Sequence, residues 1–471
     1  MKHKSIWSIL SFVLVASMIL TACQSTTSTA TTAPTNAPVT PTQGAEVLPA
    51  ANIKVMGFKV APQEVGTPLD KAYQKFLTDF QTANPNVKVD SLEAPPDFDN
   101  QILVDLAAGT APDVWPNDAS TLARLIDSKN VLDMRQCVEA DPTFNMDRFF
   151  PKLLDITKRA DGSIYGVPND GTPMVIFYNP ETFKKYNVAE PKAGWTWDDL
   201  LKTAQALTTD KNGNHPTDAS FDVNNVVTWG YRVRKYTMEW IYRAWENGGD
   251  VLSPDGTTAS GYLDSAATRE ALQFNKDLVL KYHVSPPPSA LDQMVQSMAF
   301  PDQMLTGNVA MYERGYWELV GIFASKNFNG NNLAVAPEPV KQNGDTVGYY
   351  SVFVINNAVA KDPAKLKAAC AFVDAVTLPG YQDTKAISGV AISANQVSAQ
   401  KAAATAKYPK LEAIFNSELD QSRPPYGSKY AKYPAIELIL DGMMEKILAG
   451  GDVATETSAA VVEVNRELSQ K

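Results

Sequence analysis

One segment decides the fold. Residues 162–201 read GSIYGVPNDGTPMVIFYNPETFKKYNVAEPKAGWTWDDLL. Its two short apolar runs, 164–168 and 174–178, predict strands, and the polar triplet Asn169–Asp170–Gly171 predicts a break between them. A strand that leaves one unit and enters another through a polar hinge is typical of a two-lobed protein. We therefore expect the chain to pass between two lobes near Asp170.

The second half of the segment predicts two helices. Asn179 followed by Pro180 is typical of a helix cap and a first helical position. Thr196 and Asp199 have the spacing of a capping box, which predicts the start of another helix. Strand, hinge, strand and helix thus follow one another within forty residues.

The residues before this segment alternate between strand and helix patterns. Ile53–Phe58 predicts a strand, residues 69–80 carry apolar side chains at helical spacing, and 87–89 predicts the next strand. A helical stretch at 98–106 then leads to a strand that begins at Asp113. This order predicts an α/β fold with a mostly parallel sheet, in which ligands bind beyond the carboxyl ends of the strands.

Later segments predict the return of the chain between the lobes. We expect the strand 349–355 to recross to the first lobe and a third passage to lie near Asn395. The lobes then comprise residues 51–170 plus 350–396 and residues 171–349 plus 397–471. Three passages would form a hinge that closes the lobes over a ligand as rigid bodies.

The N-terminus has the pattern of an export signal. Lys2 and Lys4 precede an apolar run from Ile6 to Leu20, which is short for a membrane span, and the run ends Leu-Thr-Ala-Cys at Cys23. This ending resembles the lipobox of bacterial lipoproteins, in which the cysteine is acylated; a plain secretory signal is the alternative. Residues 24–50 are rich in Thr, Ala, Ser and Pro and predict a disordered tether.

Composition excludes some classes of function. The chain has 42 Lys and Arg against 52 Asp and Glu, a net charge of −10, which argues against nucleic-acid binding. Beyond Cys23 only Cys137 and Cys370 occur. Cys370 lies on an apolar helical face, which favours two separate buried thiols over a disulfide.

Several short motifs together carry a family resemblance. They are the runs GSIYGVP (162–168), YNPETF (178–183), WTWDDLL (195–201), FQTANPNVKV (80–89), AAGTAPDVW (107–115) and GNVAMYERGYW (307–317). In this order they resemble the extracellular solute-binding proteins of bacterial ABC transporters, most closely the branch for sugars and oligosaccharides. The resemblance extends from about residue 51 to the C-terminus. It implies a two-lobed periplasmic-binding-protein-like fold of type II, with the ligand cleft between the lobes.

The resemblance also implies a function and partners. We expect a monomeric substrate-binding component that captures a carbohydrate outside the membrane and delivers it to the transmembrane permease subunits by lobe closure. A lipid anchor at Cys23 would hold it at the membrane, and no cofactor or metal is expected. In relatives the tryptophan that ends the 307–317 motif stacks on a sugar ring, which implies the same role for Trp317.

Other candidate ligand contacts follow from sugar chemistry, since hydroxyls need planar polar groups and the ring faces need flat aromatics. The candidates besides Trp317 are Trp115, Asn117, Asp118, Asp170, Tyr236, Trp240, Glu313, Arg314, Tyr349 and Tyr350. Structural roles compete with these assignments. Trp115 suits a core, Asp118 can cap the following helix, and Glu313 and Arg314 can pair with each other. Trp240 lies off the apolar stripe of its helical segment, so we expect its ring to face the cleft.

No motif for catalysis is present in the sequence. The three histidines are far apart, and neither a phosphate-binding loop nor a nucleophile elbow occurs. A secreted carbohydrate-active enzyme is the alternative from another class, and it would need a carboxylate pair that the sequence does not single out. A peptide, a polyamine or a phosphate ester is the alternative ligand for the same fold.

Overall fold

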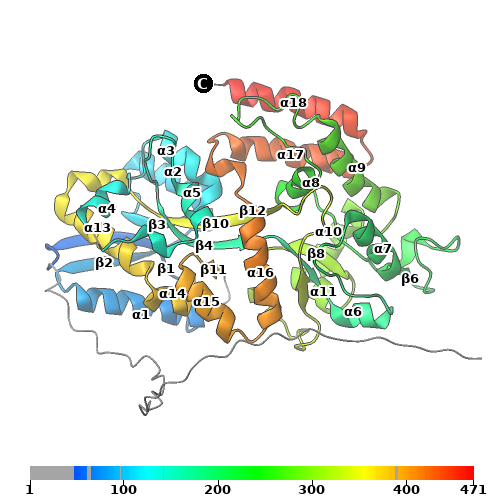
Figure 1. The fold of residues 1–471 in the computed structure, drawn as a ribbon, viewed down its shortest axis with the longest axis horizontal. Helices are drawn as coiled ribbons and strands as arrows, with labels where there is room; N and C mark the ends of the chain where they lie inside the picture. Colours follow the sequence, from blue (N-terminus) through cyan, green and yellow to red (C-terminus); the bar gives the residue numbers. More distant parts are fainter. Residues whose placement is uncertain (1–46, 61–64, 96, 142, 388–390, 471) are drawn as a thin grey trace, which may run out of the picture. The chain divides into compact units, whose positions relative to one another are not determined.

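The computed structural model describes residues 47–60, 65–95, 97–141, 143–387 and 391–470. The predicted signal, Cys23 and almost all of the predicted tether lie outside the described residues. Within 47–471 the chain forms one compact unit. Its strands form a larger and a smaller sheet, each with its own helices (Figure 1).

The larger sheet contains the first strands of the chain and those of the hinge. Its order is β11–β4–β10–β3–β1–β2, with β12 added beside β10. β1, β2 and β3 are parallel as predicted, whereas β10 is antiparallel to both β3 and β4. The strands are β1 (Ala51–Lys59), β2 (Val87–Glu93), β3 (Val114–Asp118), β4 (Val167–Pro173), β10 (Thr346–Ile355), β11 (Ile392–Ser393) and β12 (Ser422–Arg423).

Helices cover the larger sheet and bury an aromatic core. They are α1 (Pro68–Ala83), α2 (Phe98–Ala108), α3 (Leu122–Asp127), α4 (Arg135–Ala140), α5 (Pro151–Thr157), α13 (Pro363–Val376), α14 (Pro379–Ile387) and α15 (Gln396–Thr405). Phe58 of β1 contacts the rings of Phe76, Phe372 and Tyr381 from three of these helices. Burial of each such ring stabilises the fold by about 1.5–3 kcal/mol.

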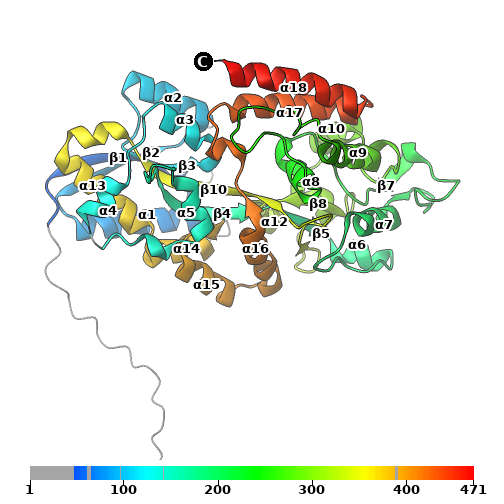
Figure 2. The ribbon, with the colours of Figure 1, turned by 45° about the horizontal axis from the view of Figure 1, so that its top comes forward.

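The smaller sheet has the order β8–β5–β9 and is antiparallel. Its strands are β5 (Val175–Tyr178), β8 (Met311–Arg314) and β9 (Ala334–Ala336), and a separate pair is formed by β6 (Thr209–Asp210) and β7 (Val226–Thr228). The surrounding helices are α6 (Pro180–Lys185), α7 (Trp197–Leu207), α8 (Ile241–Glu246), α9 (Ala266–Leu280), α10 (Pro288–Ser297), α11 (Phe300–Leu305), α12 (Glu318–Ala324), α17 (Tyr433–Leu448) and α18 (Val453–Ser469). The last two lie side by side (Figure 2).

The caps predicted for two of these helices are confirmed. Asn179 accepts a hydrogen bond from the backbone N–H of Glu181 at the start of α6, with Pro180 in the first turn. Thr196 and Asp199 form the capping box of α7. These caps fix where the chain turns after β5, and so they help to position the smaller sheet.

The predicted break at Asn169–Asp170–Gly171 is wrong, because β4 runs through it. Asn169 donates to the hydroxyl of Ser351, and Asp170 accepts from the same hydroxyl at 2.6 Å and from Lys385. Partners from distant segments thus satisfy polar groups that would otherwise interrupt a buried strand. The change of sheet comes at Met174, between β4 and β5.

Two further connections join the sheets. The second connection overall is the loop 337–345 between β9 and β10, close to the predicted recrossing at the strand 349–355. The third follows β12 and leads to α17. The predicted third passage near Asn395 is wrong, because α15 packs against α14 and β11, and β12 still pairs with the larger sheet. The helix α16 (Pro409–Gln421) lies between, in contact with β4 and β10 of the larger sheet and β9 of the smaller one (Figure 1).

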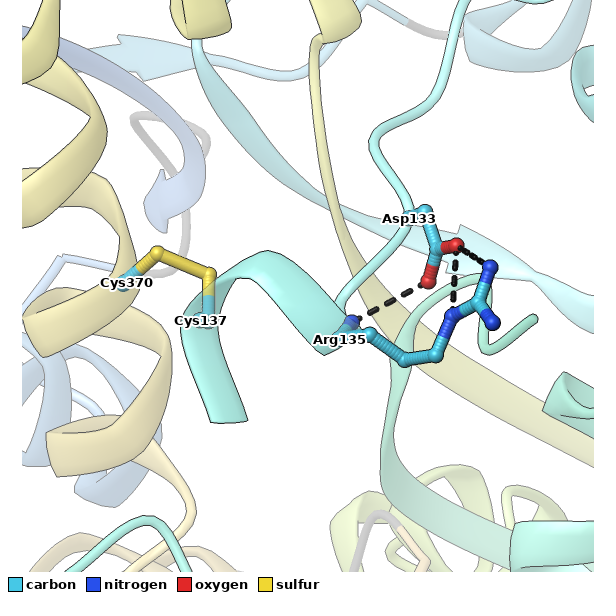
Figure 3. The surroundings of a disulfide bond; sticks show 4 residues. All are labelled: Asp133, Arg135, Cys137 and Cys370. Atoms are coloured by element: carbon cyan, nitrogen blue, oxygen red, sulfur yellow. Dashed lines mark hydrogen bonds and ion pairs between the residues drawn. A yellow bond between two sulfur atoms is a disulfide. The ribbon is translucent and has the colours of Figure 1, made fainter. Parts of the chain in front are cut away.

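The prediction of two separate thiols is also wrong. Cys137 in α4 and Cys370 in α13 form a disulfide, with Cα atoms 5.3 Å apart (Figure 3). Both residues are buried, and 233 positions separate them in the sequence. The apolar helical face on which Cys370 lies was correctly predicted, but that face packs directly against α4.

Candidate functional site

Three neighbouring strands bring polar side chains into one row at the edge of the larger sheet. β3 ends at Asp118, Ser351 of β10 lies opposite it, and Asp170 of β4 lies opposite Ser351. After β4 the chain enters the smaller sheet as β5. In that sheet β8 ends at Arg314, and α12 begins just after Trp317. Residues from both sheets therefore meet where the chain passes between them.

Asp118, Tyr349 and Glu437 influence one another electrostatically at this junction. The pKa of the Tyr349 hydroxyl is raised well above its usual range by burial and by the negative charges of Glu437 and Asp118. Burial also raises the pKa of Glu437 to about 7, helped by the charges of Asp441 and Asp118. These mutual effects couple the three groups electrostatically across the junction.

These groups remain accessible even though protein surrounds them. Asp118 is exposed, and Tyr349 and Glu437 are partly exposed, yet desolvation is the main cause that raises the pKa of each. Within the described residues neither carboxylate forms an ion pair. Accessible and unpaired groups in a desolvated setting are candidates for ligand binding. Asp118 also caps the residues that follow it by accepting from the backbone N–H of Ser120 at 2.8 Å, as the competing prediction held.

Trp317 is partly exposed and faces Tyr349. The two rings meet edge to face, with centroids 5.9 Å apart. Gly315 is required here, because a Cβ atom at this position would lie 2.1 Å from the indole ring of Trp317. The motif that ends in Trp317 thus packs the indole closely against the backbone at Gly315, just after β8.

Arg314 is held rigidly beside this pair. Its guanidinium donates to Glu239 at 2.7 Å, lies 3.5 Å from a carboxylate oxygen of Glu318 and covers the ring of Phe300 at 3.9 Å. Tyr236, which is 38% exposed, lies under the guanidinium of Arg234 at 4.3 Å. Both predicted residues are thus near the surface, with fixed orientations.

Five predicted residues are buried, and their polar groups already have partners. Trp115 donates to the side chain of Asn117, and Asn117 donates to Thr121. Trp240, which was expected to face the cleft, is fully buried and donates to the backbone of Lys235. Glu313 accepts from Tyr242 at 2.5 Å and from Arg243 at 3.0 Å, and Tyr350 bonds Ser422.

These placements correct the geometry expected from the sequence. Glu313 and Arg314 do not pair, because neighbouring residues of a strand point to opposite faces. Trp240 is turned inward because residues 237–239 form a 3₁₀-helix and the α-helix begins only at Ile241, which changes the helical phase. Asp170 is likewise engaged by Asn169, Ser351 and Lys385. No ligand contact is assigned here to any of these buried or engaged side chains.

Sequence reasoning missed the acidic residues of α17. Glu437 and Asp441 lie one helical turn apart, and Asp441 accepts from the backbone and hydroxyl of Thr237 at 2.6 and 2.7 Å. The signal was present, since Glu437, Asp441 and Glu445 recur every four residues along a largely apolar helix. Only the fold, however, brings this helix opposite Asp118.

The described residues show neither a metal centre nor a membrane helix. No group of three or more metal-binding side chains occurs among them, and none of their helices is long and apolar enough to cross a membrane. A cavity of about 570 Å³ lies elsewhere, between α12 and the pair α15 and α16, and none of the predicted residues lines it.

A model of one protein family matches residues 65–383, and its description is bacterial extracellular solute-binding protein. The chain belongs to this family. Family members are binding proteins, and membership implies an extracytoplasmic location. The bacterial extracellular solute-binding protein family also accounts for the arrangement of two sheets around a hinge, which is the two-lobed type II fold of periplasmic binding proteins.

Solved structures agree with this fold. An ABC substrate-binding protein from Listeria monocytogenes, solved with cycloalternan, has a TM-score of 0.73 and 21% identity over 89% of this chain and 99% of that one. The GacH receptor of Streptomyces glaucescens, studied with acarbose, has a TM-score of 0.68 and 18% identity over 88% and 98%. UgpB from Mycobacterium tuberculosis, bound to glycerophosphocholine, has a TM-score of 0.70 and 16% identity over 89% and 98%.

A curated relative from Brucella abortus is named only as a binding protein. It is 23% identical over 210 residues, which are 42% of this chain and 44% of the relative. The chain thus spans less than half the length of the curated relatives that it matches. At these identities the comparisons establish the fold and the family, and the ligand has to be argued from the site.

Proposed function

We propose that this protein is the substrate-binding component of an ABC importer and captures a carbohydrate outside the membrane. The observation that carries the proposal is the accessible aromatic pair Trp317 and Tyr349 beside the unpaired carboxylates of Asp118 and Glu437. Flat rings cover the C–H faces of a sugar, while carboxylates accept hydrogen bonds from its hydroxyls. Two of the solved relatives are bound to saccharides or their analogues, which agrees with this choice.

The proposed mechanism is a shift between open and closed lobes. Asp118 belongs to the larger-sheet side, whereas Trp317 and Glu437 belong to the smaller-sheet side. A ligand that contacts all three gains more binding energy when the lobes are closed, and therefore increases the population of the closed form. The transmembrane permease subunits would recognise that form, and no covalent bond is made or broken.

The site also favours some alternative ligands over others. The charges nearest to Glu437 are both negative, so the site suits a ligand that donates hydrogen bonds, either a polyhydroxyl compound or an amine. A polyamine is therefore the second candidate. A phosphate ester fits less well, because it needs a cationic donor and Arg314 already pairs with Glu239 and Glu318.

Membrane attachment and domain limits form a separate part of the proposal. An acyl chain on Cys23 and the tether 24–50 would hold a monomeric binding unit near its permease. The predicted division into residues 51–170 plus 350–396 and 171–349 plus 397–471 is kept with two changes: its first boundary at Met174, and its last boundary after β12, which pairs with the larger sheet.

A thermal-shift screen tests the proposal. The mature protein would be heated with mono- and oligosaccharides, and with peptides, polyamines and glycerophosphodiesters as comparison sets. A ligand that binds only the folded state raises the Tm, by an amount set by its concentration relative to Kd. We expect a shift with one class of saccharide that is lost in Trp317→Ala and kept in Trp195→Phe, a control at a buried tryptophan outside the proposed contacts. Stabilisation by polyamines alone would reject the carbohydrate and retain the binding fold.

A further inference from the structure

Three buried carboxyl groups pair with one arginine beside the hinge, and a fourth lies next to them. Arg243 of α8 lies 3.3 Å from Glu246, 3.0 Å from Glu313 and 3.9 Å from Glu338, and all four side chains are at most 2% exposed. Glu418 of α16 is buried next to Glu338. One positive charge thus faces four acids in a dry environment, where an uncompensated charge is costly.

Two of these acids are well provided with donors. Glu313 accepts from the hydroxyl of Tyr242 and from Arg243, and Glu246 accepts from the indole of Trp197 at 2.7 Å and from Arg243. Both can therefore share the charge of the arginine. Burial nevertheless raises the pKa of Glu246 to about 8 and the pKa of Glu313 well above its usual range.

Glu338 has no such support. Both of its carboxyl oxygens are buried without a hydrogen-bond partner in the described structure, and its only close cation is Arg243 at 3.9 Å. Burial and the charge of Glu313 raise the pKa of Glu338 well above its usual range. Burial also raises the pKa of Glu418 to about 7, although the backbone N–H of Glu338 opposes this shift.

The positions of Glu338 and Glu418 connect them to the hinge. Glu338 lies in the loop 337–345, the second connection between the sheets. The backbone N–H groups of Gln342 and Asn343 anchor this loop by donating to the backbone carbonyl of Glu246 at the end of α8. Glu418 lies on α16, which contacts strands of both sheets. The contact between α16 and this loop therefore lies where the two sheets are connected.

We propose that Glu338 and Glu418 form a proton-dependent lock between loop 337–345 and α16. When both carboxyls are neutral, the loop and the helix pack together as in the structure. When they ionise, repulsion between them and the need for water loosen this contact and free the hinge. The groups that face the pair are Arg243, Glu246 and Tyr242 from α8 and Glu313 from β8, and the single arginine among them cannot neutralise all the acids.

The sign of the effect follows from linkage. A carboxyl whose pKa is raised in the packed state stabilises that state fully below its ordinary value of 4.5, and the stabilisation is lost as the pH rises through about 7. If the pKa of Glu418 returns to its ordinary value in the loosened state, this residue alone should make the equilibrium constant for loosening about tenfold larger at pH 9 than at pH 6. Glu338 adds to this change in the same direction.

Hydrogen exchange followed by mass spectrometry tests the lock on the ligand-free protein. Protection factors, corrected for the intrinsic effect of pH, are compared between pH 6 and pH 9 for peptides that cover loop 337–345 and the end of α16. In the wild type we expect protection there to fall about tenfold or more. In Glu338→Gln/Glu418→Gln, which keeps shape and removes the titration of this pair, protection should fall much less between the two pH values, and the remaining fall belongs to Glu246, whose pKa burial raises to about 8.

Two comparisons make the result decisive. Glu463→Gln, an exposed change on α18, should retain the wild-type response. Peptides of α1 and β2, far from the hinge, should show no difference between the wild type and the double Gln variant. An unchanged pH response in the double variant, or equal protection at both pH values in the wild type, would overturn the proposal. Neither outcome depends on which ligand the protein binds.

Discussion

The disulfide gives the most quantitative prediction. Cys137 and Cys370 join α4 to α13 across 233 positions, so reduction releases a very long loop in the unfolded chain (Figure 3). The chain-entropy relation for such a loop gives about 5 kcal/mol at 25 °C, and measured disulfides often deliver less. We therefore expect removal of the bond to lower the free energy of unfolding by about 3–5 kcal/mol.

A double-mutant cycle measures this effect by urea denaturation. Cys137→Ala, Cys370→Ala and the double variant all lack the bond, so all three should lose nearly the same stability. Two separate thiols would instead give two small losses that add in the double variant, and that result would refute the reasoning. Wild-type protein refolded with a reductant should match the variants.

Three further predictions concern the site and the buried charges. Trp317→Ala should weaken binding of the best saccharide about tenfold to a hundredfold, as measured by calorimetry, while Trp317→Phe should retain more affinity. Equal affinities in the wild type and both variants would exclude stacking. Burial raises the pKa of Glu437 to about 7, above its ordinary value of 4.5, so its contribution to stability is complete below about pH 4.5 and is lost as the pH rises through 7. Glu437→Gln should therefore flatten the dependence of the Tm on pH between pH 5 and 9. An unchanged Tm profile in this variant would argue against the raised pKa. Arg243→Met leaves Glu313 and its neighbours without their cation and should cost about 3–5 kcal/mol in urea denaturation; a loss below 1 kcal/mol would mean that the acids are already neutral.

Local sequence signals predicted the elements that depend on neighbouring residues. The cap at Asn179 and the capping box at Thr196 were correctly placed because both depend on groups within three residues. The α/β order of the first lobe followed from apolar spacing. The sugar-stacking role of Trp317 stays a prediction, and the structure shows that its ring is partly exposed.

Features that depend on distant partners could not be predicted in this way. β4 continues through Asn169 and Asp170 because Ser351 and Lys385 satisfy them from segments about 180 and 215 positions away. The burial of Trp240 depends on a short 3₁₀-helix that shifts the helical phase. Glu437 becomes a candidate contact only because folding places α17 opposite the end of β3.

The central claim is that a carbohydrate bridges the two lobes at Trp317 and Asp118 and closes them. Small-angle X-ray scattering of the protein with and without the most stabilising saccharide tests this claim most directly. The account predicts a smaller radius of gyration at saturating sugar, and a need for far more sugar to reach it in Trp317→Ala. A radius of gyration that stays constant at saturation, with binding verified by calorimetry, would contradict closure as the mechanism.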